Sequence, residues 1–137
     1  MESSTEMIVA DTHIIIWDAL KPESLSKKAR EAIRTANEMD GIIFCEISLW
    51  EIAMLIQKNR IKINASYLEF INLIKSSNNF IFKGISPEIA ELSANLSEEI
   101  NPDPADRIIC ATSILTNAQL ITADKNLRKS KSLRTIW

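Results

Sequence analysis

Short, continuous apolar runs are separated by longer stretches in which apolar residues recur at helical spacing. Continuous runs, unlike alternating ones, are typical of strands in a parallel sheet that helices cover on both faces. Strands that alternate with helices along the chain indicate a doubly wound α/β domain, so we expect a central, mainly parallel sheet. The predicted strands cover residues 7–10, 42–46, 80–85 and 119–122, and a short last one covers 134–137.

Helix start and stop signals fall between these runs. Ser26 is the expected cap of one helix, and Pro22 ends the helix before it. Ser48 and Glu51 have the spacing of a capping box, and Asn64 is the expected cap of another helix. The predicted helices cover residues 12–20, 26–37, 48–57, a segment that starts at 64, 86–97 and 103–117.

The composition fits one domain with a sizeable core. The chain has 137 residues, 46% of them apolar, and its two glycines and four prolines are too few for a turn-rich all-β design. Residues 1–6 do not resemble a signal peptide, and no apolar stretch is long enough to span a membrane. Cys45 and Cys110 lack a CxxC spacing. We expect a polar extension at residues 1–6, a single domain at 7–137 without membrane contact, and reduced thiols in a cytoplasmic protein.

Four carboxylates lie where the hydrophobic pattern changes. Asp11 and Asp124 follow predicted strands, whereas Glu51 and Asp106 fall in the first turns of predicted helices. The carboxyl ends of parallel strands meet at one edge of a sheet, where ligand sites form. Acids crowded together raise one another's pKa, and a divalent cation relieves that repulsion. The pattern therefore predicts a pocket of oxygen ligands for Mg²⁺ or Mn²⁺.

Each acid also has a purely structural explanation. Glu51 could complete a capping box with Ser48, and Asp11 could cap the helix after the first strand. Asp106 would complement a helix dipole if Asp103 is the cap. Asp124 could form a turn with the Lys-Asn pair that follows it. Four such coincidences at one sheet edge are harder to explain than one shared site.

The absence of several common catalytic motifs excludes most classes of hydrolytic mechanism. His13 is the sole histidine, which excludes a two-histidine RNA cleavage mechanism, and no GxSxG, HExxH, phosphate loop or GxGxxG is present. Metal-assisted hydrolysis remains, in which a metal acidifies a water and holds phosphate oxygens. His13 is expected to be a cap or a supporting group rather than a ligand. Trp50, Met54 and Leu55 are expected in the core or at an interface.

Charge is distributed unevenly along the chain. The net charge of −2 does not indicate a nucleic-acid binder, but residues 124–137 carry +4, which leaves −6 on residues 1–123. A second basic group lies at residues 27–34. Basic patches beside a carboxylate pocket can hold phosphates, although either group could also be a solvated face.

Four motifs contain the acids in a fixed order. They read Val-Ala-Asp-Thr-His at 9–13, Ser-Leu-Trp-Glu-Ile at 48–52, Asp-Pro-Ala-Asp-Arg at 103–107 before an apolar helix, and Leu-Ile-Thr-Ala-Asp at 120–124. In order and spacing they resemble the PIN domain, a metal-dependent nuclease fold, and most closely its VapC-type toxin branch. The resemblance covers residues 7–137, and the third motif is the most distinctive.

The resemblance implies a PIN-like three-layer α/β/α domain with an acidic catalytic pocket of Asp11, Glu51, Asp106 and Asp124. Asp11 and Asp106 would be the principal ligands of Mg²⁺ (or Mn²⁺). Glu51 and Asp124 would bind directly or through water. Asp103 is an alternative to Asp106 as the third metal acid.

The family also implies supporting residues and partners. Thr12 and Ser48 would hold the acids in place, and Lys125 and Arg128 are expected RNA contacts. The implied activity is endoribonucleolytic cleavage of tRNA or ribosomal RNA by a homodimeric toxin that a cognate antitoxin silences. The alternatives are a housekeeping PIN nuclease and a non-catalytic PIN domain that binds RNA or a partner. A receiver-like signalling module is disfavoured, because Asp11 has no adjacent second acid.

Overall fold

A computed structural model describes residues 7–137, and the predicted extension at residues 1–6 lies outside the described residues. Its centre is a five-stranded sheet with the order β3-β2-β1-β4-β5, in which every neighbouring pair is parallel. This confirms the prediction of a mainly parallel sheet. The strands are β1 Ile8–Ala10, β2 Ile42–Cys45, β3 Phe80–Lys83, β4 Gln119–Ile121 and β5 Thr135–Ile136.

Helices connect the strands, as the spacing of apolar residues predicts. The segment after β4 also contains a short helix, α7, that the sequence pattern did not indicate, and a 3₁₀ turn follows the first helix at Pro22–Ser24. The helices are α1 Thr12–Leu20, α2 Lys27–Glu38, α3 Ile47–Gln57, α4 Tyr67–Ser77, α5 Pro87–Asn95, α6 Pro104–Thr116 and α7 Lys125–Lys129.

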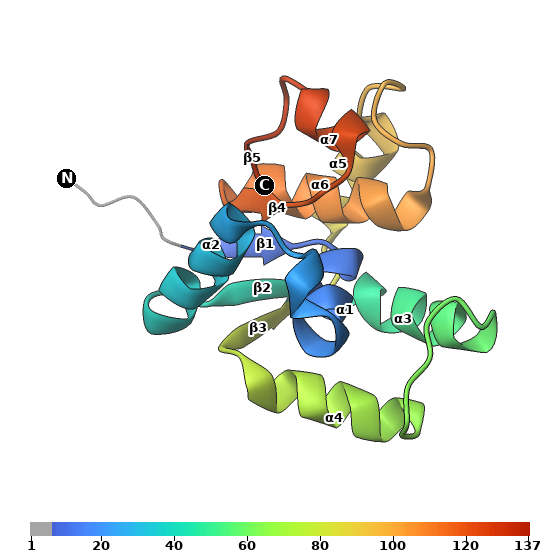
Figure 1. Ribbon diagram of the computed structural model, residues 1–137. Coiled ribbons are helices and arrows are strands. Elements are labelled where there is room, and N and C mark those ends of the chain that lie inside the picture. Colours follow the sequence, from blue (N-terminus) through green and yellow to red (C-terminus); the bar gives the residue numbers. More distant parts are fainter. Residues whose placement is uncertain (1–6) are drawn as a thin grey trace.

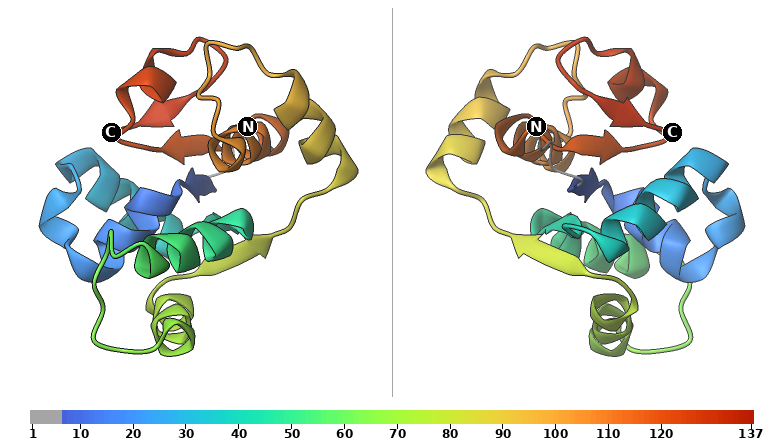
Figure 2. Two further views of the ribbon diagram at one scale, coloured as in Figure 1. Left: turned by 90° about the vertical axis from the view of Figure 1, so that its right-hand side faces the viewer. Right: turned by 90° about the vertical axis from the view of Figure 1, so that its left-hand side faces the viewer.

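The helices form a layer on each side of the sheet (Figures 1 and 2). Strand residues alternate between the two faces: Ile8 and Phe44 pack against α1, α2, α3 and α4, whereas Val9 and Ile43 pack against α6 and α7. Helix α5 covers α6 from outside. Both faces are therefore buried, which explains the continuous apolar runs and confirms the three-layer α/β/α architecture.

The predicted capping box at Ser48 and Glu51 is wrong. Helix α3 begins at Ile47 after a Glu46 cap that makes no side-chain bond, so Ser48 lies inside the first turn. The Ser48 hydroxyl is instead 2.7 Å from that of Thr12 on α1, at a buried contact between the two helices. The Ser48 hydroxyl thus makes a tertiary hydrogen bond in place of the local one that the spacing allowed. A capping box therefore does not account for the presence of an acid at Glu51.

The cap predicted at Asn64 is also misplaced. Ser66 caps α4, accepting from the Glu69 N–H at 3.1 Å, while the Ser66 N–H donates to the Glu69 carboxylate at 2.9 Å. This is a capping box two residues farther on. The cap predicted at Ser26 is confirmed, because its hydroxyl accepts from the Ala29 N–H at 3.1 Å.

The topology sets one edge of the sheet apart. From β1 the chain adds β2 and β3 on one side of the sheet and then β4 and β5 on the other, so the strand order reverses between β1 and β4. These two neighbouring strands lead into different helix layers. In doubly wound sheets the crevice at the carboxyl ends of such strands is the usual ligand site. In Figure 1 the chain leaves β1 for α1 and β2 for α3 on the right-hand side, so these ends meet there.

Two further expectations concern cysteines and membranes. Cys45 and Cys110 are both buried and are not bonded to each other, so their predicted place in the core is confirmed. Within residues 7–137, every helix is too short or too polar to cross a bilayer.

Candidate active site

Asp11 lies at the carboxyl end of β1, where the chain turns into α1. Its backbone N–H continues the sheet by donating to the Ile121 carbonyl at 3.2 Å, and its carboxylate caps α1 by accepting from the Ile14 N–H at 3.1 Å. Burial raises the pKa of Asp11, against the opposing hydrogen bonds from Thr122 and Ile14. The cap predicted for Asp11 is confirmed. A capping carboxylate can remain hydrated, so capping alone does not account for the desolvation of this one.

Glu51 faces Asp11 from α3. The Thr12 hydroxyl donates to the Glu51 carboxylate and also contacts Ser48, and both hydroxyl residues are buried. Burial raises the pKa of Glu51 to about 7, and the charges of Asp106, Asp103 and Asp11 add to the shift while the bond from Thr12 opposes it. A carboxylate this costly to ionise is a typical functional group rather than a surface charge.

Helix α6 supplies two acids from its first turn. Asp103 is the N-cap, with its carboxylate 2.8 Å from the Ala105 nitrogen and 3.2 Å from that of Asp106. Burial raises the pKa of Asp106, which the Asn101 amide lowers and nearby acids raise. Glu51, Asp103 and Asp106 each place a carboxylate oxygen within 4.8 Å of the others. Asp103 thus combines two roles that the sequence left as alternatives: it caps α6 and it faces the cavity.

Asp124 is the N-cap of α7, where its carboxylate accepts from the Asn126 and Leu127 N–H groups at 2.8 and 3.2 Å. Its other oxygen accepts from the Asn101 amide at 2.8 Å, and the same amide nitrogen donates to Asp106 at 3.0 Å. The Asn101 side-chain oxygen accepts from the Asn126 side-chain amide at 2.6 Å. Asn101 therefore joins the two acids on the side of the pocket formed by α6 and α7.

Sequence reasoning missed Asn101 and Arg107. The Arg107 guanidinium donates to the Ser93 carbonyl at the end of α5, at 2.9 Å, and to carbonyls of the α5–α6 loop, among them Leu96 at 2.5 Å and Ile100 at 3.3 Å. It fixes the loop that carries Asn101 and Asp103. The place of Arg107 in the Asp-Pro-Ala-Asp-Arg motif was a signal for it, whereas Asn101 has no comparable signal.

The acids enclose one cavity of about 360 Å³. Hard carboxylate oxygens that converge from several elements on a polar cavity are the donor set that Mg²⁺ and Mn²⁺ prefer, so these residues fit a divalent cation of that class. The exposed His13 ring also borders the cavity and lies 6.0 Å from that of Trp17. The lining residues are Asp11, Thr12, His13, Trp17, Glu51, Asp103, Asp106, Ala123 and Asp124.

None of the described residues that line this cavity is a lysine or an arginine. Lys125 and Arg128 are exposed on α7 and do not line it, and the basic residues at 27–34 lie along α2 beside a separate hollow. A smaller cavity of about 200 Å³ shares Glu51 and Asp103 with the acidic one and contains two cations. Its lining residues are Trp50, Glu51, Met54, Leu55, Lys58, Arg60 and Asp103.

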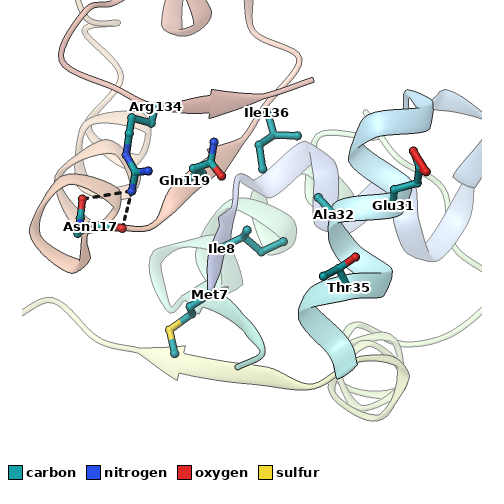
Figure 3. A pocket seen from close by; sticks show the side chains of 9 residues that line it. All are labelled: Met7, Ile8, Glu31, Ala32, Thr35, Asn117, Gln119, Arg134 and Ile136. Carbon is teal, nitrogen blue, oxygen red and sulfur yellow. Dashed lines mark hydrogen bonds between the residues drawn. The ribbon is translucent and has the colours of Figure 1, made fainter. Parts of the chain in front are cut away.

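Another cavity, of about 220 Å³, lies at the opposite end of β1 and β4 (Figure 3). Figure 3 shows Arg134 turned toward Asn117, where its guanidinium donates to the backbone carbonyl at 2.6 Å and to the side-chain oxygen at 3.1 Å. Glu31 is the sole acid among the residues that line it. Arg134 is already paired and Glu31 has no second acid beside it in the lining, so this cavity lacks the converging carboxylates of the acidic cavity.

Fold and site together define a parallel α/β domain with an acidic cavity at its topological switch point, and comparison with known proteins identifies the class. The family model of the PIN domain matches residues 8–132, so the chain belongs to the PIN domain family. It is 31% identical over 132 residues to ribonuclease VapC22 of Mycobacterium tuberculosis (strain ATCC 25618 / H37Rv). The matched region covers 95% of this chain and 98% of VapC22.

Solved structures share the fold. A toxin–antitoxin complex from Klebsiella pneumoniae aligns over 91% of this chain and 93% of its own, with a TM-score of 0.62 and 23% identity. VapBC2 from Rickettsia felis, solved bound to a DNA fragment from the promoter, aligns over 94% and 96%, with a TM-score of 0.70 and 15% identity. At these identities the likeness concerns the fold alone.

Proposed function

We propose that this protein is a metal-dependent endoribonuclease that acts as the toxin of a toxin–antitoxin pair. The observation that carries the proposal is the convergence of Asp11, Glu51, Asp106 and Asp124 on one cavity at the switch point. Support comes from the relative at 31% identity, which is named a ribonuclease. A housekeeping PIN nuclease would share the cavity and differ in its partners. An RNA-binding PIN domain without activity would not need four intact acids.

In this proposal, Asp11 and Asp106 would hold Mg²⁺ or Mn²⁺, and Glu51 and Asp124 would bind it directly or through water. The proximity of Asp103 to Glu51 and Asp106 makes it a further oxygen donor. A cation bound there would neutralise charge on the phosphodiester and make an attacking water more acidic.

The chain's own residues prepare the acids for this task. Thr12 bonds both Glu51 and Ser48, which holds Glu51 toward the cavity. Burial and the neighbouring acids raise the pKa of the Glu51 carboxylate to about 7 without a cation, and a bound divalent cation would favour its ionised form. Asn101 holds Asp106 and Asp124 on the other side. The two sets of bonds fix the acids before any ligand enters.

The proposal is tested by incubating purified protein with tRNA and ribosomal RNA in Mg²⁺, in Mn²⁺ and in EDTA. Cleavage should require the divalent ion, and Asp11→Asn should abolish it while the circular dichroism spectrum stays unchanged. Glu91→Gln, an exposed acid on α5, is the matched control and should cleave as the parent does. Full activity of Asp11→Asn would refute the assignment of the site.

Further parts of the proposal concern partners. One of the solved structures that share the fold is named a toxin–antitoxin complex, which motivates a cognate antitoxin for this chain. We also propose a homodimer in the cytoplasm. Lys125 and Arg128, exposed beside Asp124, are proposed contacts to RNA phosphates. A small reading frame directly beside the gene, whose product copurifies with this chain and suppresses cleavage, would support a toxin over a housekeeping nuclease.

A further inference from the structure

We propose that the groove along α3 binds the single strand of RNA that leaves the acidic cavity. Trp50 would stack on a base, while Lys58 and Arg60 would bind the following phosphates. This inference rests on the proposed ribonuclease function and adds a path for the substrate. It assigns a role to Trp50, which lies inside the second acidic motif, and to two cations that follow that motif.

The groove is continuous with the acidic cavity. Glu51 and Asp103 line both hollows, so a chain whose scissile phosphate lies among the acids can continue into the groove without leaving the protein surface. Lys58 is the residue directly after α3 and follows Glu51 by seven positions, which corresponds to about 10 Å along the helix axis. The groove therefore meets first an acid, then apolar surface, then a cation at the end of the helix.

Trp50 has the exposure expected of a binding residue rather than of a core residue. It is 58% exposed, although it stands one residue before the half-buried cavity acid Glu51 on the same helix. The sequence predicted core or interface packing for Trp50, and the core part of that prediction is wrong. An exposed indole beside a phosphate-binding cavity is a suitable platform for a nucleobase, since every base has a π-face and stacking tolerates any sequence.

The two cations are free to meet a ligand. Lys58 and Arg60 are both exposed, and within residues 7–137 neither side chain has a hydrogen bond or ion pair. Their backbone is nevertheless fixed: the Arg60 N–H donates to the Leu55 carbonyl at 2.9 Å, and Asn59 between them adopts a left-handed φ of 58°. Unpaired cations on a fixed turn at the end of an otherwise acidic site match a polyanion.

Charge complementarity favours RNA over the other occupants of such a groove. A second copy of this chain or a partner protein would cover Trp50 and Met54, but it would not explain unpaired cations that flank a cavity proposed to hold phosphates. The basic residues of α2 lie beside a hollow that shares no residue with the acidic cavity. They therefore offer a control surface of the same charge.

The test measures binding of a fluorescein-labelled single-stranded RNA oligonucleotide over a series of salt concentrations. All variants are built on Asp11→Asn, so that the RNA stays intact. Lys58→Ala with Arg60→Ala should weaken binding about tenfold and reduce the slope of log affinity against log salt by about 1.4, from two lost phosphate contacts. Trp50→Ala should weaken binding about tenfold with little change in that slope.

The matched control is Lys27→Ala with Arg30→Ala, which removes the same charge from α2 and should leave affinity within twofold of the parent. Equal losses in both double variants would overturn the inference, because net charge alone would then explain them. Unchanged affinity in the α3 variants would also overturn it. If Trp50→Ala alters the molecular mass by light scattering and leaves RNA binding intact, the groove is an interface between copies.

The two proposals fail in different ways. If the parent protein cleaves RNA only with Mg²⁺ or Mn²⁺ while the α3 variants bind RNA as the parent does, the function stands and the substrate path is wrong. If the parent neither binds nor cleaves any RNA, both are wrong.

Discussion

The amide nitrogen of Asn101 lies 2.8 Å from the carboxylate of Asp124, and the same nitrogen lies 3.0 Å from that of Asp106. An NH₂ group offers two hydrogens, so each acid accepts one. The amide therefore separates two carboxylates that would otherwise repel each other. Its own oxygen accepts from Asn126, which fixes the orientation of the side chain.

Removing this amide should weaken metal binding more than it weakens the fold. Groups that orient metal ligands through hydrogen bonds typically contribute about 10- to 100-fold to metal affinity. We expect Asn101→Ala to lower Mn²⁺ affinity about tenfold, measured by calorimetric titration. Asn72→Ala, an exposed asparagine on α4, is the control and should bind Mn²⁺ as the parent does.

A double-mutant cycle separates positioning from a general loss of structure. If Asn101 acts through Asp124, the loss from Asn101→Ala should become much smaller in an Asp124→Asn background. Fully additive losses would contradict that role. The urea midpoint of each variant shows whether any loss of affinity follows from unfolding.

Asn101 also shows where sequence reasoning ends. Asp11 and Asp124 were found because a buried strand leads into each acid, a feature that hydrophobic patterning records. Asn101 lies in the loop between α5 and α6, and its partners are 5, 23 and 25 residues away. No local periodicity encodes such contacts, because the fold alone brings them together.

The error at Ser48 has the same origin. Its spacing to Glu51 suits a local capping box, but the hydroxyl bonds Thr12, which is 36 residues away. Local spacing predicted the helix correctly and the partner of the Ser48 hydroxyl incorrectly. The sequence thus indicated the sheet, six of the seven helices and the converging acids, whereas the bonds that orient those acids needed the folded structure.

Thr12→Val should test the link between α1 and α3. Valine keeps the shape but cannot donate to Glu51 or bond Ser48, and it leaves a buried hydroxyl and carboxylate with one partner fewer. We expect a loss of about 1–3 kcal/mol in the free energy of unfolding, measured by urea titration, together with slower RNA cleavage. Thr12→Ser, which retains the hydroxyl, should recover most of both. Equal behaviour of the valine and serine variants would exclude a role for the hydrogen bonds.

The raised pKa of Glu51 makes the stability of the metal-free protein depend on pH. The pKa is about 7 in the fold against an ordinary 4.5, so between these values the folded state binds a proton that the unfolded state has lost. Stability must therefore fall as pH rises through this interval, by on the order of 2 kcal/mol once the shift is reduced for solvent screening of this partly exposed carboxylate. Urea titrations in EDTA at pH 5, 6, 7 and 8 measure the effect.

Glu51→Gln supplies the comparison for that pH series. Glutamine cannot ionise, so the fall in stability should be reduced in the variant, while Glu91→Gln should keep it in full. Mg²⁺ added at pH 8 should restore stability to the parent protein, because ligand binding to the native state shifts the unfolding equilibrium. An identical pH profile for Glu51→Gln and the parent would mean that another group causes the fall.

Arg107 gives the last prediction, because it anchors the loop from which Asn101 and Asp103 reach the site. Its planar guanidinium serves several carbonyls at once, including Leu96 and Ser93, and a lysine ammonium cannot match that fork. Arg107→Lys keeps the charge but should lower the free energy of unfolding by about 2–3 kcal/mol and weaken Mn²⁺ binding through the displaced loop. Arg34→Lys, exposed on α2, should change neither. A stable Arg107→Lys variant with normal Mn²⁺ affinity would show that the backbone of the loop holds the site unaided.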